Sequence, residues 1–169
     1  MLINSNIYKC GRLFPFQIPA GDWMDKLDAE ILRALNKNAR RSFRDIAMEL
    51  DVGLSTVSNR VRQLEEEGVI LGYAPVVAPE KVGYDLFAVI GVRIAHGKLI
   101  EVQKQIAKDR RVYGVYDVTG DYDCILVTRF KNRKEMNDFI KSLTAMENVE
   151  RTYTQLVLNV VKEEKRVEF

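Results

Sequence analysis

Residues 42–68 read SFRDIAMELDVGLSTVSNRVRQLEEEG, and this stretch decides the fold of the N-terminal part of the chain. Ser42 followed by Asp45 is typical of a capped helix start, and Gly53 and Gly68 interrupt the helical pattern. We expect Gly53 to take the left-handed backbone conformation that a tight turn between two helices needs. Apolar residues recur at helical spacing between these breaks, at Phe43, Ile46, Ala47 and Leu50 and then at Val57, Val61 and Leu64.

Another helix is predicted before this stretch. From Met24 onward the apolar residues again fall on one stripe, at Leu27, Ile31, Leu32 and Leu35. Three short helices in one compact segment predict a winged-type helix-turn-helix domain over residues 24–72. Residues 69–77 look like a short strand and the start of a linker, placed at 73–84, while residues 1–23 are expected to be an N-terminal extension.

The predicted helix that starts near Ser55 carries a polar outer face. With its apolar stripe buried, Ser55, Asn59 and Arg62 point outward, Ser58 and Gln63 lie beside them, and Thr56 and Arg60 lie on the flank. Such side chains can bind base edges and phosphates, and Arg40, Arg41 and Arg44 add positive charge nearby. A solvated helix face is the alternative for a lone helix. The acidic run 65–67 implies that the N-terminal half of the helix enters the major groove of double-stranded DNA.

After residue 84 the hydrophobic period changes. Strands are predicted over residues 86–95, 112–119, 124–130 and 149–161, and helices over 99–111 and 135–146. The order βαββαβ specifies a ferredoxin-like α+β sandwich over residues 85–169, with both helices on one face of an antiparallel sheet. We expect this domain to pair with itself, because one recognition helix reads only a few base pairs.

Composition excludes several other functions. The 169 residues carry a net charge of +2 and no apolar run long enough to span a membrane, and the first 23 residues lack the apolar run of a secretory signal, so a cytoplasmic protein is expected. Cys10 and Cys124 are expected to be free thiols, and His96 is the only histidine, which argues against a zinc site. The sequence shows no catalytic constellation, and an enzyme is not expected.

Several runs of residues resemble the Lrp/AsnC family of transcriptional regulators. In the N-terminal half these are Leu27-Asp28, Ile31-Leu32, Ile46-Ala47, Leu54-Ser55, residues 60–65, Gly68-Val69-Ile70 and Gly72-Tyr73; in the C-terminal half they are residues 114–116, 119–123 and 149–154. The resemblance covers Met24 to about Glu164, whereas residues 1–23 depart from the family pattern.

The resemblance implies an amino-acid effector, no other cofactor, and a homo-oligomer: a dimer, or a tetramer or octamer built from dimers. Carried over from the family, the effector site comprises Gly120, Asp121 and Asp123 on a turn and Thr152 and Thr154 on the last strand. Paired carboxylates suit an ammonium group, and hydroxyls and backbone N–H groups suit a carboxylate.

Other interpretations remain open on sequence alone. Asp121 and Asp123 could belong to an ordinary hairpin turn, or hold a divalent cation. For the whole chain, the alternatives are a metabolite-binding regulatory subunit of an enzyme, which the helix-turn-helix argues against, and an architectural DNA-binding protein with little sequence preference.

Overall fold

The computed structural model describes residues 24–164 and 166–168, which divide into two compact units. The first, here called the helical unit, extends to Pro75 and includes the described residues from Glu164 onward, where Asn36 Nδ2 donates to the Val167 carbonyl at 3.1 Å. The second, the sheet unit, spans Val76–Glu163. The predicted extension 1–23, including Cys10, lies outside the described residues. No helix in the described part of the chain has the length and apolar character needed to cross a membrane.

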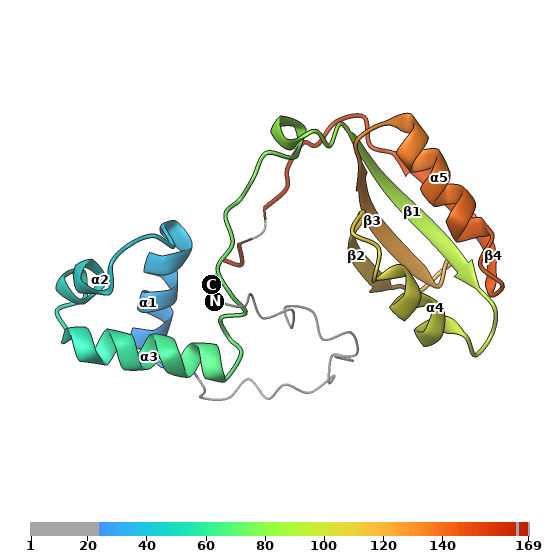
Figure 1. Cartoon of the computed structure of the whole chain (residues 1–169). Helices are drawn as coiled ribbons and strands as arrows, with labels where there is room; N and C mark the ends of the chain where they lie inside the picture. The colour runs from blue at the N-terminus through green and yellow to red at the C-terminus, as the bar shows by residue number, and fades with distance from the viewer. Residues whose placement is uncertain (1–23, 165, 169) are drawn as a thin grey trace. The chain divides into compact units, whose positions relative to one another are not determined.

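The helical unit contains α1 (Lys26–Lys37), α2 (Phe43–Glu49) and α3 (Leu54–Glu66), as predicted (Figure 1). Asp25 and Asp28 form a reciprocal capping box at the start of α1, and the Ser42 side chain accepts from the Asp45 amide at 3.1 Å at the start of α2. The apolar stripes meet in one core, formed by Ile31, Ala34, Leu35, Ile46, Ala47, Val57 and Val61. Burial of these stripes, more than intrinsic helix propensity, holds three such short helices in place.

The turn between α2 and α3 differs from the prediction. The left-handed residue is Asp51, with φ of 53°, whereas Gly53 is extended and forms the N-cap of α3. The Val52 amide donates to the Ala47 carbonyl at 3.0 Å, so α2 ends in a Schellman motif with Asp51 in the left-handed position. Aspartate tolerates the left-handed conformation better than most residues, so Asp51 can take this position. The prediction that Gly53 is the left-handed residue was wrong.

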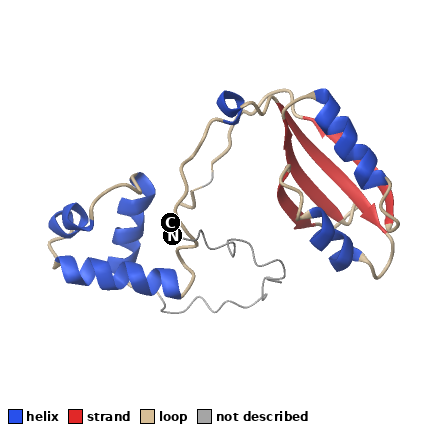
Figure 2. Cartoon of the chain, in the orientation of Figure 1, coloured by secondary structure: helices blue, strands red, loops and turns tan. Residues whose placement is uncertain are grey.

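Residues 69–77 form no strand, so the prediction of a short strand there was wrong. Figure 2 shows helices and loops but no strand in the described residues of the helical unit. The chain turns at Gly68, with φ of 73°, and Ile70 then packs against the helical core. A strand needs a neighbour for its backbone groups, and none of the described segments pairs with this one.

The 3-10 helix η1 (Pro79–Val82) ends at Gly83, with φ of 85°.

The sheet unit has the predicted βαββαβ order. Its elements are β1 (Leu86–Ile94), α4 (Leu99–Ile106), β2 (Val112–Asp117), β3 (Cys124–Phe130), α5 (Arg133–Thr144) and β4 (Val149–Leu156). The strands are antiparallel in the order β2-β3-β1-β4. β4 ends at Leu156 rather than at residue 161, because β1 begins at Leu86 and the last backbone contact runs from the Val157 amide to the Phe87 carbonyl at 2.8 Å.

Both helices cover the same face of the sheet (Figure 1). Their apolar residues share one core with alternate residues of β1 and β3, comprising Ala88, Ile90, Val92, Ile94, Val102, Ile106, Cys124, Leu126, Phe130, Phe139 and Leu143. Cys124 is a free, fully buried thiol, and burial raises its pKa to about 11, as befits a core residue. The ferredoxin-like fold class is confirmed.

The opposite sheet face, here called the open face, has no covering helix within its unit. The register places Val89, Gly91, Ile125 and Val127 on this face, where the three larger side chains stay half-buried. Tyr122 lies over Gly91 and stacks on Tyr153, with ring centroids 6.0 Å apart and planes at 17°. The open face is therefore apolar and aromatic over its centre.

Candidate DNA-binding and effector sites

The outer face of α3 carries the polar residues predicted to contact DNA. Val57, Val61 and Leu64 are at most 2% exposed, which fixes the orientation of the helix. Ser55, Ser58, Asn59, Arg62 and Gln63 are exposed, while Thr56 and Arg60 are half-buried on the flank. The structure therefore gathers the predicted set along one accessible side of α3.

Arg60 differs from its neighbours because its guanidinium group is engaged within the helical unit. Its Nη2 lies 2.9 Å from Oδ2 of Asp25, and its Nη1 lies 3.3 Å from Oδ2 of the buried Asp28. The backbone amide of Asp28, and secondarily the charge of Arg60, hold the pKa of Asp25 below its usual value against the effect of desolvation. Arg60 therefore ties α3 to the capping box of α1, and its contact with DNA stays a prediction.

Arg62 and Gln63 make only weak contacts at the surface. Arg62 Nη2 donates to Asn59 Oδ1 at 3.2 Å. Its Nε lies 4.0 Å from Glu66 Oε1, and the side chains of Arg62 and Glu66 are 69% and 72% exposed. Gln63 donates to Glu67 at 2.8 Å. Exposed pairs of this kind contribute about 0–1 kcal/mol, so a phosphate or a base edge can replace them at little cost.

The acidic run after these residues also has a structural partner. The Tyr73 hydroxyl donates to Glu65 Oε1 at 3.0 Å, and burial, reinforced by that carboxylate, raises the pKa of Tyr73 to about 12. Tyr73 therefore stays neutral and attached to the C-terminal part of α3. Negative charge accumulates at this end of α3, and the prediction that this end points away from DNA rests on that charge.

The predicted basic residues before and within α2 fall into two groups. Arg40 and Arg44 are exposed, and their side chains form no ion pair within the described part of the chain. Arg41 is half-buried, pairs with Glu49 and donates to the Asp45 carbonyl at 3.4 Å. The guanidinium groups of Arg40 and Arg44 are thus available to bind phosphates, whereas the guanidinium group of Arg41 is already engaged by two residues of α2.

Met48 was missed by sequence reasoning. Its side chain is 76% exposed on α2 although it is apolar. The signal was present, because position 48 lies off the stripe formed by Phe43, Ile46 and Ala47, and an off-stripe apolar residue is expected at the surface. Such a residue can contact a thymine methyl group or the sugar backbone.

The predicted effector turn joins β2 to β3 as a hairpin, as expected. Gly120 has φ of 121°, a conformation that favours glycine, and Asp121 is exposed. Asp123 is committed to the fold: its Oδ2 accepts from the Ile94 amide at 2.7 Å, and its own amide donates to the Val92 carbonyl at 3.0 Å. Asp121 is therefore the turn carboxylate that is open to a ligand.

Thr152 and Thr154 lie on β4, on the other side of β1 from the turn. They pair with Val92 and Ile90, so their half-buried side chains lie on the helix-covered face of the sheet. Surface pockets of about 540 and 510 Å³ are lined by other residues. Within one chain, the structure does not bring the turn and the threonines into a common pocket.

Tyr122, between the two turn aspartates, was not singled out from the sequence. A Cβ atom at Gly91 would lie 2.8 Å from Tyr122 Cγ, so the ring rests directly on the backbone of β1. A glycine inside a strand often marks such a close approach, and Gly91 was therefore the available signal. Among the described residues, no group of three His, Cys, Asp or Glu is arranged to hold a metal ion, so the cation alternative for Asp121 and Asp123 gains no support.

The two units define a class of protein: a regulator with a helix-turn-helix domain and a separate ligand-binding domain. Residues 24–70 match the model of a winged helix-turn-helix DNA-binding domain, and residues 87–167 match the Lrp/AsnC ligand-binding domain. An HTH-type transcriptional regulator of Pyrococcus abyssi, described as uncharacterized, is 47% identical over 145 residues, which cover 86% of this chain and 99% of that protein. The chain belongs to the Lrp/AsnC family of transcriptional regulators.

Further similarities agree with this assignment. The HTH-type transcriptional regulator FL11 of Pyrococcus furiosus is 36% identical over 140 residues, which cover 83% of this chain and 93% of FL11. Among solved structures, the Neisseria meningitidis transcriptional regulator NMB0573 in complex with L-Met has a TM-score of 0.77 at 26% identity, covering 86% of this chain and 96% of that chain. The expectations of family, fold class and function as a transcriptional regulator are confirmed.

Proposed function

We propose that this regulator places the N-terminal half of α3 in the major groove of its operator and responds to an amino acid bound in the sheet unit. The observation that carries the DNA part is the accessible polar side of α3, opposite the fully buried Val57. Ser55, Thr56, Ser58, Asn59, Arg62 and Gln63 are the groups that read bases or bind phosphates there.

Arginines outside α3 add contacts to the DNA backbone. Arg40 and Arg44 are exposed and without ion-pair partners among the described residues, so they can bind phosphates without first breaking an internal contact. Arg41 and Arg60 contribute chiefly by holding α2 and the capping box of α1, because their guanidinium groups are already engaged there. This division separates residues that contact DNA from residues that position them.

The effector is proposed to be an amino acid. NMB0573, which shares the fold, was solved with L-Met, and the exposed carboxylate of Asp121 suits the ammonium group of such a ligand. Gly120 can present its backbone amide to the ligand carboxylate. Since Thr152 and Thr154 lie across β1 from the turn, we propose that a second subunit completes the site.

A dimer is proposed to form through the open face of the sheet unit. Val89, Ile125 and Val127 are half-buried at its centre, and Tyr116 and Tyr153 are 57% and 48% exposed on the same face. A symmetric dimer offers two α3 helices to two half-sites about one helical turn apart, near 34 Å. The assembled protein acts in the cytoplasm, where its DNA lies.

Gel-shift titrations of the full chain on its own promoter and on random DNA test this function. Tighter binding to the promoter, changed by one of the twenty amino acids, is the expected result. Equal affinity for both DNAs indicates an architectural protein instead, and no binding to either indicates a regulatory subunit of another protein. A monomer in light scattering at micromolar concentration contradicts the proposed dimer.

A further inference from the structure

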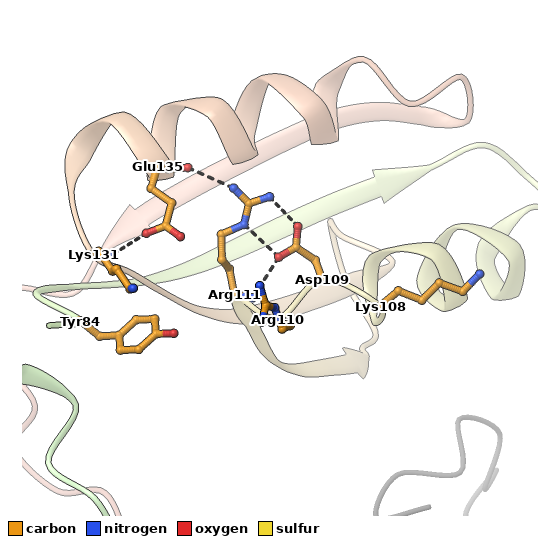
Figure 3. Close-up of a pocket in the computed structure, with 7 residues that line it drawn as sticks. All are labelled: Tyr84, Lys108, Asp109, Arg110, Arg111, Lys131 and Glu135. Atoms are coloured by element: carbon orange, nitrogen blue, oxygen red, sulfur yellow. Dashed lines mark hydrogen bonds and ion pairs between the residues drawn. The ribbon is translucent and has the colours of Figure 1, made fainter. Parts of the chain in front are cut away.

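A basic pocket lies at the end of the sheet unit that is remote from the effector turn. Its volume is about 540 Å³, and it is lined by Tyr84, Lys108, Asp109, Arg110, Arg111, Lys131 and Glu135 (Figure 3). The register places Val112, opposite Thr128, at the pocket end of β2, and Asp117, opposite Cys124, at the turn end. A six-residue strand separates the two sites, roughly 17–20 Å.

Both carboxylates in the pocket accept hydrogen bonds from neighbouring residues, and only Asp109 is paired with a cation from the described part of the chain. Asp109 Oδ1 accepts from Arg111 Nε at 2.9 Å and its Oδ2 accepts from Arg111 Nη2 at 2.6 Å, so Arg111 neutralises it through a two-pronged contact. Arg111 Nη1 also donates to the Glu135 carbonyl at 3.5 Å, which ties the wall to α5. The Glu135 carboxylate accepts from the Lys131 amide at 2.7 Å.

Three cations remain without a carboxylate partner. Lys108, Arg110 and Lys131 are exposed and form no ion pair within residues 24–164 and 166–168. Figure 3 shows Lys131 beside Tyr84, Arg110 next to the Arg111–Asp109 pair, and Lys108 extending away from these residues next to α4. The Lys131 ammonium group lies 5.8 Å from the centre of the Tyr84 ring, which gives the pocket an aromatic wall beside a cation.

We propose that this pocket binds a phosphate group, carried either by the DNA backbone or by a free nucleotide. Arg110 and Lys131 supply two positive charges, and the Tyr84 hydroxyl supplies a neutral donor. The aromatic ring suits the sugar or base next to the phosphate. The pocket is separate from the effector turn, since it is formed by other residues at the other end of β2.

The test compares the full-length parent with the double variant Arg110→Gln, Lys131→Gln. A matched control, Lys104→Gln with Lys141→Gln, removes two exposed lysines that do not line the pocket. Calorimetry with AMP and with inorganic phosphate measures free ligands, and the salt dependence of affinity for duplex DNA measures backbone contacts.

If the phosphate belongs to DNA, the logarithmic salt slope should fall by about 1 to 2 in the pocket variant and not in the control. If the ligand is a free nucleotide, AMP should bind the parent about tenfold or more tightly than the pocket variant, with the salt slope unchanged. The proposal is overturned if neither quantity changes, or if the control variant changes as much as the pocket variant. Should the pocket variant misfold, NMR titration of the parent replaces the comparison. Addition of AMP or DNA must then change the chemical shifts of the backbone amides of Arg110 and Lys131. Unchanged amide shifts overturn the proposal.

Discussion

The guanidinium group of Arg60 lies 2.9 Å from Oδ2 of Asp25, so α3 is tied directly to the N-cap of α1. Replacing Arg60 by Ala leaves the buried carboxylate of Asp28 without its cation and should destabilise the helical unit by about 1–3 kcal/mol. Urea unfolding followed by circular dichroism measures this. Arg62→Ala serves as the matched control and should stay within about 0.5 kcal/mol of the parent; equal stability of all three proteins contradicts a positioning role for Arg60.

Acid should weaken the same capping box. Because the pKa of Asp25 is lowered in the fold, the stability it supplies is present above its unfolded pKa and is lost as the pH falls through the lower folded value. Asp25→Asn keeps a good N-cap without the charge, so the parent should exceed the variant in stability at about pH 6, and this advantage should shrink as the pH falls below about 4, the unfolded pKa of an aspartate. An advantage that does not depend on pH contradicts the assigned cause.

Gly91 and Tyr122 should behave as a coupled pair. A methyl group at Gly91 meets the Tyr122 ring, so Gly91→Ala should destabilise the sheet unit by about 1–3 kcal/mol through overpacking. In a Tyr122→Ala background the space is free, and the same substitution should cost much less. Thermal unfolding of the four proteins gives the coupling energy; additive effects indicate that the ring does not rest on β1 in solution.

The two turn aspartates should separate ligand binding from folding. Asp121→Ala removes an exposed carboxylate and should weaken amino-acid binding by about 1.5–3 kcal/mol with little change in stability. Asp123→Ala removes the acceptor of the Ile94 amide and should destabilise the fold by about 1–3 kcal/mol. Calorimetry and thermal unfolding of both variants check this, and undiminished ligand binding by the Asp121 variant rules out that carboxylate as a ligand contact.

Sequence periodicity predicted the helices, the order of helices and strands along the chain, and the accessible side of α3, because each depends on local spacing and burial. The α3 stripe of Val57, Val61 and Leu64 is one such case. The strand expected at 69–77 was wrong because strands depend on a partner that local pattern does not reveal. The Gly53 expectation failed for a subtler reason, since glycine suits both a left-handed turn and an extended N-cap.

Contacts between distant positions were the ones that sequence reasoning could not find. A helical wheel places Arg60 on the flank of α3 but does not show that Asp25 and Asp28 lie beside it. Likewise, the turn pattern marks Asp121 and Asp123 as equivalents, and only the position of the Ile94 amide distinguishes them. The residues of both candidate sites could therefore be predicted from the sequence. Which of them are free to bind a ligand and which hold the fold together could be decided only from the structure.

Recognition of the operator by the exposed side of α3 is tested by the substitution Arg62→Ala. Fluorescence anisotropy on operator and random DNA, with Lys26→Ala on α1 as the control, measures the effect. We predict a loss of about 1–3 kcal/mol in operator affinity for Arg62→Ala, with a smaller loss on random DNA and none for the control. An Arg62→Ala variant that binds the operator as tightly as the parent does would mean that Arg62 does not read it.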